Sequence, residues 1–180
     1  MDYGQHTRSV PLLGEDGLSK LQNAKVAVFG VGGVGGHLCE ALARAGVGEL
    51  HLFDKDTVSL TNINRQAVAL HSTVGQPKVE VMAQRIRDID PTIRVETRQC
   101  FFSEENADSF DFSAFSYVID AIDTVSAKVE LVCRAKAVNT PIVSCMGAGN
   151  KLDPTKFVVT DLAKTDTCPL ARVLRQRLRK

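Results

Sequence analysis

The chain has 180 residues, of which 44% are hydrophobic and 24% charged, and its formal net charge is +1. A normal hydrophobic fraction with balanced charge excludes a disordered chain. No apolar run approaches the roughly 18 residues of a membrane-spanning helix, which excludes a membrane span. The first ten residues lack the apolar core of a signal peptide. The length predicts one domain over residues 1–180.

The five cysteines are spread along the chain, and no two are fewer than twelve positions apart: Cys39, Cys100, Cys133, Cys145 and Cys168. An odd number without close pairs argues against a disulfide framework and against a structural zinc site built from cysteine pairs. We therefore expect reduced thiols.

Short apolar runs alternate with segments of helical spacing. The runs expected to be strands are Lys25–Gly30, Leu50–Asp54, Ile93–Phe101, Tyr117–Asp120 and Pro141–Cys145. Apolar residues at helical spacing follow or precede them in the ranges 34–42, 79–89, 127–135 and 170–178. This alternation predicts an α/β fold with a doubly wound, mainly parallel sheet, in which ligands bind at the carboxyl ends of the strands.

The end of the first predicted strand carries a run of glycines that opens a predicted helix. Glycines permit a tight turn there and let backbone N–H groups approach a phosphate at the helix N-terminus. The candidate nucleotide-binding glycines are Gly30, Gly32, Gly33 and Gly35. A glycine-rich turn without a ligand is the alternative, and the motif alone does not say which nucleotide binds.

Two carboxylates, Asp54 and Asp56, follow the second predicted strand. An acidic side chain about twenty residues after a glycine turn suits the hydroxyl groups of a ribose, in NAD and ATP alike. Helix capping is the alternative for both residues.

The next segment favours a triphosphate over a dinucleotide. It combines amides and cations: Thr61, Asn62, Asn64, Arg65 and Lys78. Arginine binds phosphate oxygens as a fork, and lysine neutralises charge that develops during nucleotidyl transfer. A surface salt bridge is the alternative for Arg65 alone.

Asp120 and Asp123 flank the tip of a third strand, with Thr124 at the start of the next helix. Carboxylates beside phosphates hold Mg²⁺ through one or two ligands, so we predict a magnesium site at Asp123, with Asp120 as a second candidate ligand. The alternative for Asp123 is a helix cap.

These residues resemble the adenylating domain of the ubiquitin-activating-enzyme-like superfamily, which includes the activators of molybdopterin and thiamine sulfur carriers. The most specific part is Asp54-x-Asp56-x-Val58-x3-Asn62-x2-Arg65-Gln66, and the resemblance runs from about Arg8 to the end of the chain. Within the superfamily, HSTVGQPKVEVM, YVIDAIDTV and KTDTCPLARVLRQRLRK are most similar to the tRNA threonylcarbamoyladenosine dehydratase family.

This resemblance implies a Rossmann-like adenylating fold, a homodimer, a cytoplasmic location and an enzyme that uses ATP and Mg²⁺. Its members activate the threonylcarbamoyl carboxylate of a modified tRNA adenosine and eliminate the activating group as a ring closes. One alternative is adenylation of the C-terminal carboxylate of a ubiquitin-like sulfur-carrier protein. Another is a non-catalytic ATP-binding module that recruits a partner such as a cysteine desulfurase or a sulfur acceptor. An NAD oxidoreductase explains neither Arg65 nor Lys78.

The resemblance also assigns roles to single residues. Gly33 lines the nucleotide pocket, Asp54 contacts the ribose, and residues 61–65 with Lys78 contact the phosphates. Asp123, beside Thr124, resembles the magnesium and adenylation carboxylate. Arg8 matches an arginine that reaches the partner's active site in dimers of the superfamily. The implied catalytic residues are therefore Arg8, Arg65, Lys78 and Asp123.

Three departures from the superfamily pattern stand out. Gln5 occupies the position of a second arginine, three residues before Arg8. The zinc-binding C-x-x-C of sulfur-carrier activators is broken, because Cys168 is followed at the required spacing by Ala171, so we expect no zinc site. Family members continue beyond residue 180, so we expect C-terminal strands of the family to be lacking. Cys145 and Cys168 are expected to be structural thiols.

The positive charge is concentrated at the end of the chain, in Arg172, Arg175, Arg177, Arg179 and Lys180. These five residues contribute a charge of +5. Because the net charge of the whole chain is +1, residues 1–171 carry a net charge of −4. We expect an amphipathic helix whose basic face contacts the tRNA backbone. The alternative is a solvated helix with arginines favoured by the helix dipole.

Overall fold

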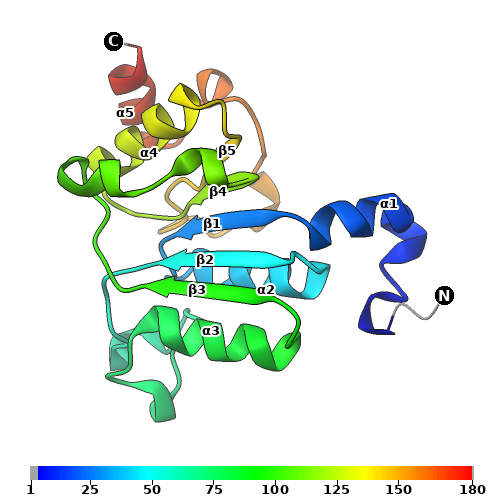
Figure 1. The fold of residues 1–180 in the computed structure, drawn as a ribbon. Coiled ribbons are helices and arrows are strands. Elements are labelled where there is room, and N and C mark those ends of the chain that lie inside the picture. Colours follow the sequence, from blue (N-terminus) through cyan, green and yellow to red (C-terminus); the bar gives the residue numbers. More distant parts are fainter. Residues whose placement is uncertain (1–3, 180) are drawn as a thin grey trace.

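The computed structural model describes residues 4–179, which form a five-stranded sheet with helices on both faces (Figure 1). All neighbouring strands are parallel and their order is β3-β2-β1-β4-β5. The strands are β1 (Lys25–Phe29), β2 (Glu49–Phe53), β3 (Arg94–Arg98), β4 (Tyr117–Asp120) and β5 (Ile142–Ser144). Strand order reverses between β1 and β4, so the predicted doubly wound parallel sheet is confirmed.

The alternation of side chains along β1 builds two cores. Val26 and Val28 belong to one core with α2 (Gly35–Ala45) and α3 (Lys78–Ile89). Ala27 and Phe29 face the opposite way and belong to a second core with α4 (Val125–Ala137). Because both faces of the strand are covered, its sequence is apolar throughout, as the sequence analysis expected.

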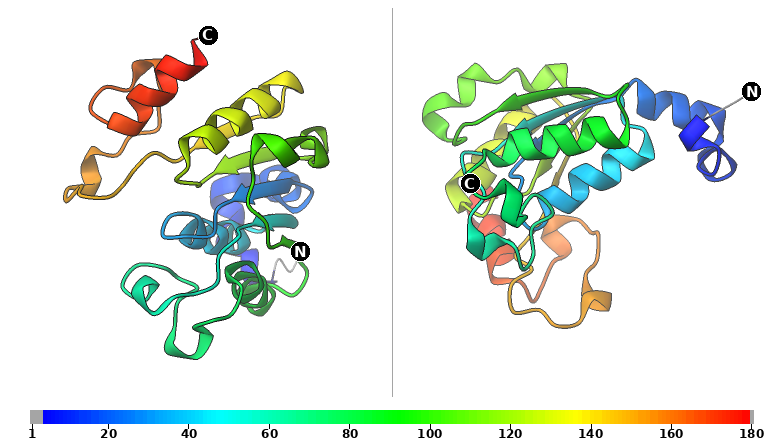
Figure 2. Two further views of the ribbon diagram at one scale, coloured as in Figure 1. Left: turned by 90° about the vertical axis from the view of Figure 1, so that its left-hand side faces the viewer. Right: turned by 90° about the horizontal axis from the view of Figure 1, so that it is seen from below.

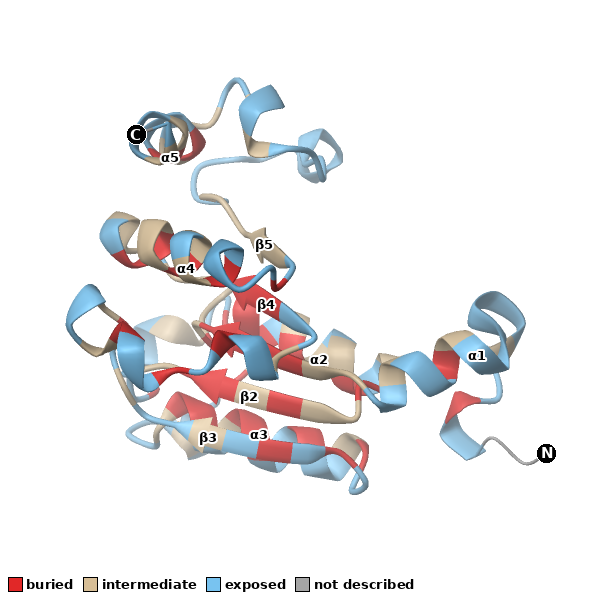
Figure 3. Ribbon diagram, turned by 45° about the horizontal axis from the view of Figure 1, so that its top comes forward, coloured by how far each residue is buried: buried red, intermediate tan, exposed pale blue. Residues whose placement is uncertain are grey.

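The helices α2 and α3 end at the glycine and proline boundaries that their sequences predict. Gly46, in the left-handed region with φ of +88°, ends α2. Pro77 precedes α3, which ends before Pro91. The apolar helical spacing near the end of the chain corresponds to α5 (Pro169–Leu178), whose Ala171 and Leu174 are buried (Figure 3).

Other elements were not predicted. The helix α1 (Val10–Gln22) lies beyond the amino ends of the strands and is interrupted at Gly14, which is not helical (Figure 1). β3 ends at Arg98, so residues 99–101 are not strand, contrary to the expected run to Phe101. Short 3₁₀ helices precede or connect the other elements: η1 (Gly4–His6), η2 (Leu60–Asn62), η3 (His71–Thr73), η4 (Glu104–Ser109), η5 (Phe112–Ala114), η6 (Pro154–Lys156) and η7 (Leu162–Lys164).

The segment between β5 and α5 stands away from the sheet in both views of Figure 2 and is mostly exposed in Figure 3. Within residues 4–179, no helix has the length and apolar character needed to cross a membrane.

Candidate functional site

A cavity of about 710 Å³ opens at the carboxyl ends of the strands, around the point where strand order reverses. Nine of the sequence-predicted site residues line it: Gly30, Gly32, Gly33, Asp54, Asp56, Asn62, Arg65, Lys78 and Asp123. Residues far apart in the chain therefore meet at the edge where ligands of such sheets bind.

The glycine turn has two kinds of glycine. Gly30 has a φ of +93°, and a Cβ there would lie 2.6 Å from the Ala121 carbonyl oxygen. A Cβ on Gly35 would overlap the Gly30 carbonyl oxygen, so this glycine lets α2 approach β1 and does not itself line the cavity. A Cβ on Gly33 would make only an ordinary van der Waals contact, 3.8 Å from Arg65 Cγ. Gly30 and Gly35 thus shape the turn, while Gly33 leaves room for a ligand.

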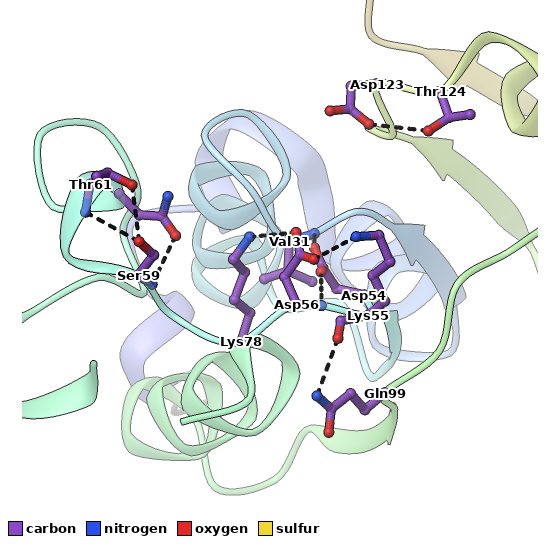
Figure 4. Close-up of polar contacts among 11 residues, drawn as sticks. Val31, Asp54, Lys55, Asp56, Ser59, Thr61, Lys78, Gln99, Asp123 and Thr124 are labelled. Carbon is purple, nitrogen blue, oxygen red and sulfur yellow. Dashed lines mark hydrogen bonds and ion pairs between the residues drawn. The ribbon is translucent and has the colours of Figure 1, made fainter. Parts of the chain in front are cut away.

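Asp54, at the end of β2, holds the glycine turn in place. Its Oδ2 accepts a hydrogen bond from the Val31 N–H at 2.7 Å, and its Oδ1 accepts one from the Asp56 N–H at 2.9 Å (Figure 4). Each carboxylate oxygen can accept a second hydrogen bond, so Asp54 can still bind a ribose hydroxyl. Asp54 can therefore hold the glycine turn and bind a ribose hydroxyl at the same time.

Lys78 is brought to the cavity by the start of α3. Its side chain is 7% exposed, and Nζ lies 3.1 Å from Asp56 Oδ2 (Figure 4). The Lys78 backbone N–H also donates to the Asp56 carbonyl oxygen. Hydrogen bonds from Lys55, then from Lys78, lower the pKa of the Asp56 carboxyl despite partial burial. The Lys78 side chain is thus held beside the glycine turn.

Arg65 lines the cavity and is positioned by its neighbours. Its Nη1 donates to the Thr61 carbonyl oxygen and to Asn64 Oδ1, both at 3.0 Å. Thr61 and Asn64 do not line the cavity, so in this structure they orient the guanidinium. Asn62 does line it, while its Oδ1 accepts from the Ser59 N–H and caps the 3₁₀ turn.

Asp123 lies across the cavity from Lys78, on the loop between β4 and α4 (Figure 4). Its carboxylate is exposed and Oδ1 accepts a hydrogen bond from Thr124 Oγ1 at 3.4 Å. Thr124 is the residue before α4 but makes no side-chain cap. Asp120 does not line the cavity, because its side chain is 0% exposed and paired with Lys128 at 2.9 Å. The two aspartates therefore lie in different environments.

Two walls of the cavity lie outside the predicted site residues, although Cys145 was expected at the end of a strand and near the site. Residues 100–102, after β3, form one, and Phe101 is the most exposed of them. Residues 145–149, with Leu170 of α5, form the other. The first was missed because the expected strand ran to Phe101. Had the strand been predicted to end at Arg98, residues 100–102 would have been expected at the carboxyl edge of the sheet, beside the cavity.

The two thiols singled out from the sequence differ. Cys145 lines the cavity, and burial raises the pKa of its thiol. Burial would by itself raise the pKa of Cys168, but backbone N–H groups of Ala171, Leu170 and Gly147 outweigh it, so this pKa lies below its ordinary value. Among the described residues, no three His, Cys, Asp or Glu side chains come together as a metal site.

Some predicted residues lie away from the cavity. Arg8 is exposed in the turn between η1 and α1, and it does not line the cavity of its own chain. In α5, Arg175 donates to Thr165 Oγ1, whereas Arg172, Arg177 and Arg179 are exposed. The last predicted residue, Lys180, lies outside the described residues.

This arrangement of glycine turn, aspartates and cations has a counterpart among known proteins. The model of the ThiF family matches residues 3–177. The chain belongs to the ThiF family. This confirms the superfamily that the sequence motifs indicate.

Relatives of the chain carry two different names. The tRNA threonylcarbamoyladenosine dehydratases of Bacillus subtilis and Escherichia coli are 49% and 46% identical to the chain, over 98% and 93% of its length. The chain spans 69% and 63% of these two relatives. The molybdopterin-synthase adenylyltransferase of Salmonella typhimurium is 34% identical over 87% of the chain and 62% of that relative.

Solved structures agree with the sequence comparison. The crystal structure of the E. coli tRNA N6-threonylcarbamoyladenosine dehydratase in complex with ATP matches with a TM-score of 0.94 and 44% identity. The match covers 98% of this chain and 72% of that one. A relative that shares the fold of this chain has thus been solved in complex with ATP.

Proposed function

We propose that this chain is an ATP-dependent adenylating enzyme acting on tRNA threonylcarbamoyladenosine, with residues 1–180 forming one ATP-binding domain. The observation that carries the proposal is the meeting of Lys78, Arg65 and Asp123 around a glycine turn at the switch point of the sheet. The cavity supports nucleotide binding only. The choice of tRNA threonylcarbamoyladenosine as the acceptor rests on the dehydratase relatives, which are 42–49% identical to the chain.

In the first step, a carboxylate oxygen of the threonylcarbamoyl group attacks the α-phosphorus of ATP, and pyrophosphate leaves. A carboxylate is a poor electrophile, and this mixed anhydride with AMP makes its carbonyl carbon reactive. The Arg65 guanidinium and the Lys78 ammonium stabilise charge on the phosphates. Lys78 is held beside the glycine turn by Asp56 before any ligand binds, which lowers the cost of ordering it.

In the second step, a nucleophile within the modified base attacks the activated carbonyl carbon, AMP leaves, and a ring forms. Because the nucleophile belongs to the substrate, no catalytic cysteine is required. Cys145 lines the cavity, and burial raises the pKa of its thiol, which disfavours the thiolate form.

The residues present suit Mg²⁺, because one exposed carboxylate beside a triphosphate site is a common arrangement for this ion. Asp123 would hold the ion, which supplies charge neutralisation on the phosphates. Asp120, buried and paired with Lys128, is not available as a second ligand in this conformation.

We further propose a homodimer in the cytoplasm. Arg8 is exposed and does not line the cavity of its own chain, so the role that the family resemblance gives it would be at the site of a partner copy. The sulfur-carrier alternative is weaker, because the adenylyltransferase relatives are more distant than the dehydratases. A cysteine desulfurase or sulfur acceptor is expected as a partner only if the chain proves to be a non-catalytic ATP-binding module.

Pyrophosphate exchange tests the proposal. Labelled pyrophosphate should enter ATP when the chain is mixed with Mg²⁺, ATP and tRNA carrying threonylcarbamoyladenosine, but not with unmodified tRNA. Exchange driven by a sulfur-carrier protein would establish the alternative function. Calorimetry should show ATP binding that NAD does not displace, and ATP binding without exchange with any acceptor would identify the non-catalytic module.

A further inference from the structure

Lys128 of α4 is fully buried, with a side chain that is 0% exposed. Lysine is almost never buried without a partner, because removing an ammonium from water is costly. Its Nζ donates to Asp120 Oδ1 at 2.9 Å and to the Cys145 carbonyl oxygen at 2.8 Å. The ammonium thus joins the end of β4 to the first residue after β5, both of which pack beside α4 (Figure 3).

The carboxylate partner extends this connection toward the cavity. Asp120 Oδ1 also accepts the Ile122 N–H at 3.2 Å, in the loop that carries Asp123. The Asp120 carbonyl oxygen accepts the Cys145 N–H at 2.8 Å. One buried ion pair therefore ties down two separate cavity walls, the Asp123 loop and the segment 145–149.

Stability alone does not account for the pair. A buried ion pair can often be exchanged for apolar residues of similar volume at little cost, because desolvation cancels the attraction. The neighbouring buried positions of α4, Ala127, Leu131 and Ala135, are apolar. What apolar residues cannot supply is directional bonding to the Ile122 N–H and the Cys145 carbonyl.

We infer that Lys128 and Asp120 are positioning residues that hold the Asp123 loop and the segment 145–149 at a defined separation across the cavity. This rests on the proposed adenylation, in which Asp123 faces the phosphates. The pair touches no substrate, and it acts through Asp123.

The test removes both charges together, in Lys128→Met/Asp120→Val, so that no unpaired charge remains buried. The melting temperature should change little. ATP affinity should stay within about twofold, and the pyrophosphate-exchange rate should fall about tenfold or more because Asp123 is no longer aimed. Amide hydrogen exchange of Ile122, whose acceptor Asp120 Oδ1 is removed, should accelerate by about tenfold or more. Lys136→Met, at an exposed position of the same helix, is the matched control.

A double-mutant cycle with Asp123→Asn separates positioning from a general loss of structure. In the Asp123→Asn background, the paired change should cost less than about twofold further in rate, since the two act through one group. A folded double variant with full exchange activity, or costs that add completely, would overturn the inference.

The unmodified chain provides a test that needs no variant. The Ile122 amide lies in a loop, yet its acceptor is a buried carboxylate, so its hydrogen exchange should be slowed about a hundredfold or more relative to an unstructured peptide. Exchange at the unprotected rate would show that the connection does not persist in solution, and the inference would fail. Lack of ATP binding by the unmodified chain would instead defeat the proposed function, whatever the Ile122 amide does.

Discussion

The two sides of the cavity are held in different ways. On the side of β1, β2 and α3, the Asp54 carboxylate accepts two backbone N–H groups, and the Lys78 ammonium pairs with Asp56. On the side of β4 and β5, Asp123 is exposed, and its described side-chain hydrogen bond comes from Thr124 at 3.4 Å. The first side is held by its own hydrogen bonds and ion pair, whereas the second depends on the Lys128–Asp120 pair behind it.

The two sides of the cavity also differ in how the chain packs behind or after them. Behind the first side lies a core that includes Val28, Leu52 and Met82, all 0% exposed. After the second side, the chain leaves the sheet and exposes large apolar residues, among them Leu152 and Val159, each 98% exposed. Preorganised groups suit electrostatic stabilisation of phosphates, while a less supported wall suits a place where a large acceptor enters.

The largest effect on the pyrophosphate-exchange rate is expected from the side of β1, β2 and α3. Lys78→Met removes a cation held at the phosphate site, and we expect the pyrophosphate-exchange rate to fall by about 10²–10³-fold. The melting temperature should also fall by a few degrees, because the pairing with Asp56 is lost. Lys20→Met, on the exposed surface of α1, should change neither quantity. Normal exchange by Lys78→Met would remove Lys78 from the mechanism.

On the other side, Asp123→Asn should lower the rate by about 10²-fold, because the proposed magnesium ligand is lost where charge develops. Unlike Lys78→Met, this change should leave the melting temperature unchanged, since the Asp123 side chain is exposed and its described hydrogen bond is a long one from Thr124. Exchange assays and thermal unfolding measure the two effects, with Asp88→Asn on α3 as control. A drop in stability equal to that of Lys78→Met would contradict the contrast between the two sides.

A smaller effect is expected at α5, whose exposed arginines adjoin the less supported side. Arg172→Gln/Arg177→Gln/Arg179→Gln should weaken tRNA binding by about tenfold and flatten its salt dependence, because phosphate contacts release counterions. ATP affinity should not change. Titrations at several salt concentrations measure this, and the matched control removes three exposed arginines from α2 and α3: Arg44→Gln/Arg85→Gln/Arg87→Gln. An unchanged salt slope would make α5 a solvated surface.

The smallest effect concerns pH. The pKa of Asp56 is lowered in the folded chain by Lys55 and Lys78, so the stabilisation is present above the unfolded pKa of about 4 and is lost as pH falls through the folded value. Asp56→Asn should therefore lower the melting temperature by a degree or so near neutral pH, and the gap should close below about pH 4. Thermal unfolding across pH 3–7 measures it. A gap independent of pH would show that Asp56 acts without its charge.

The sequence by itself determined the order and type of the strands and helices that surround the cavity. Apolar periodicity and glycine or proline boundaries are local signals, and they located all five strands within a few residues. Because parallel strands end at one edge, the residues after Gly30, Asp54 and Asp120 were expected to converge, and the cavity confirms that they do.

Only the tertiary structure decided which of these residues reach the cavity. Asp120 and Asp123 are three positions apart and equally acidic, yet one is buried and the other exposed. Asp120 is the last residue of the inner strand β4 and pairs with buried Lys128 of α4, whereas Asp123 lies in the loop between β4 and α4. Thr61 and Asn64 likewise bond to Arg65 instead of lining the cavity. Spacing along the chain specifies which strand end carries a side chain. The depth and partner of that side chain depend on elements packed from elsewhere.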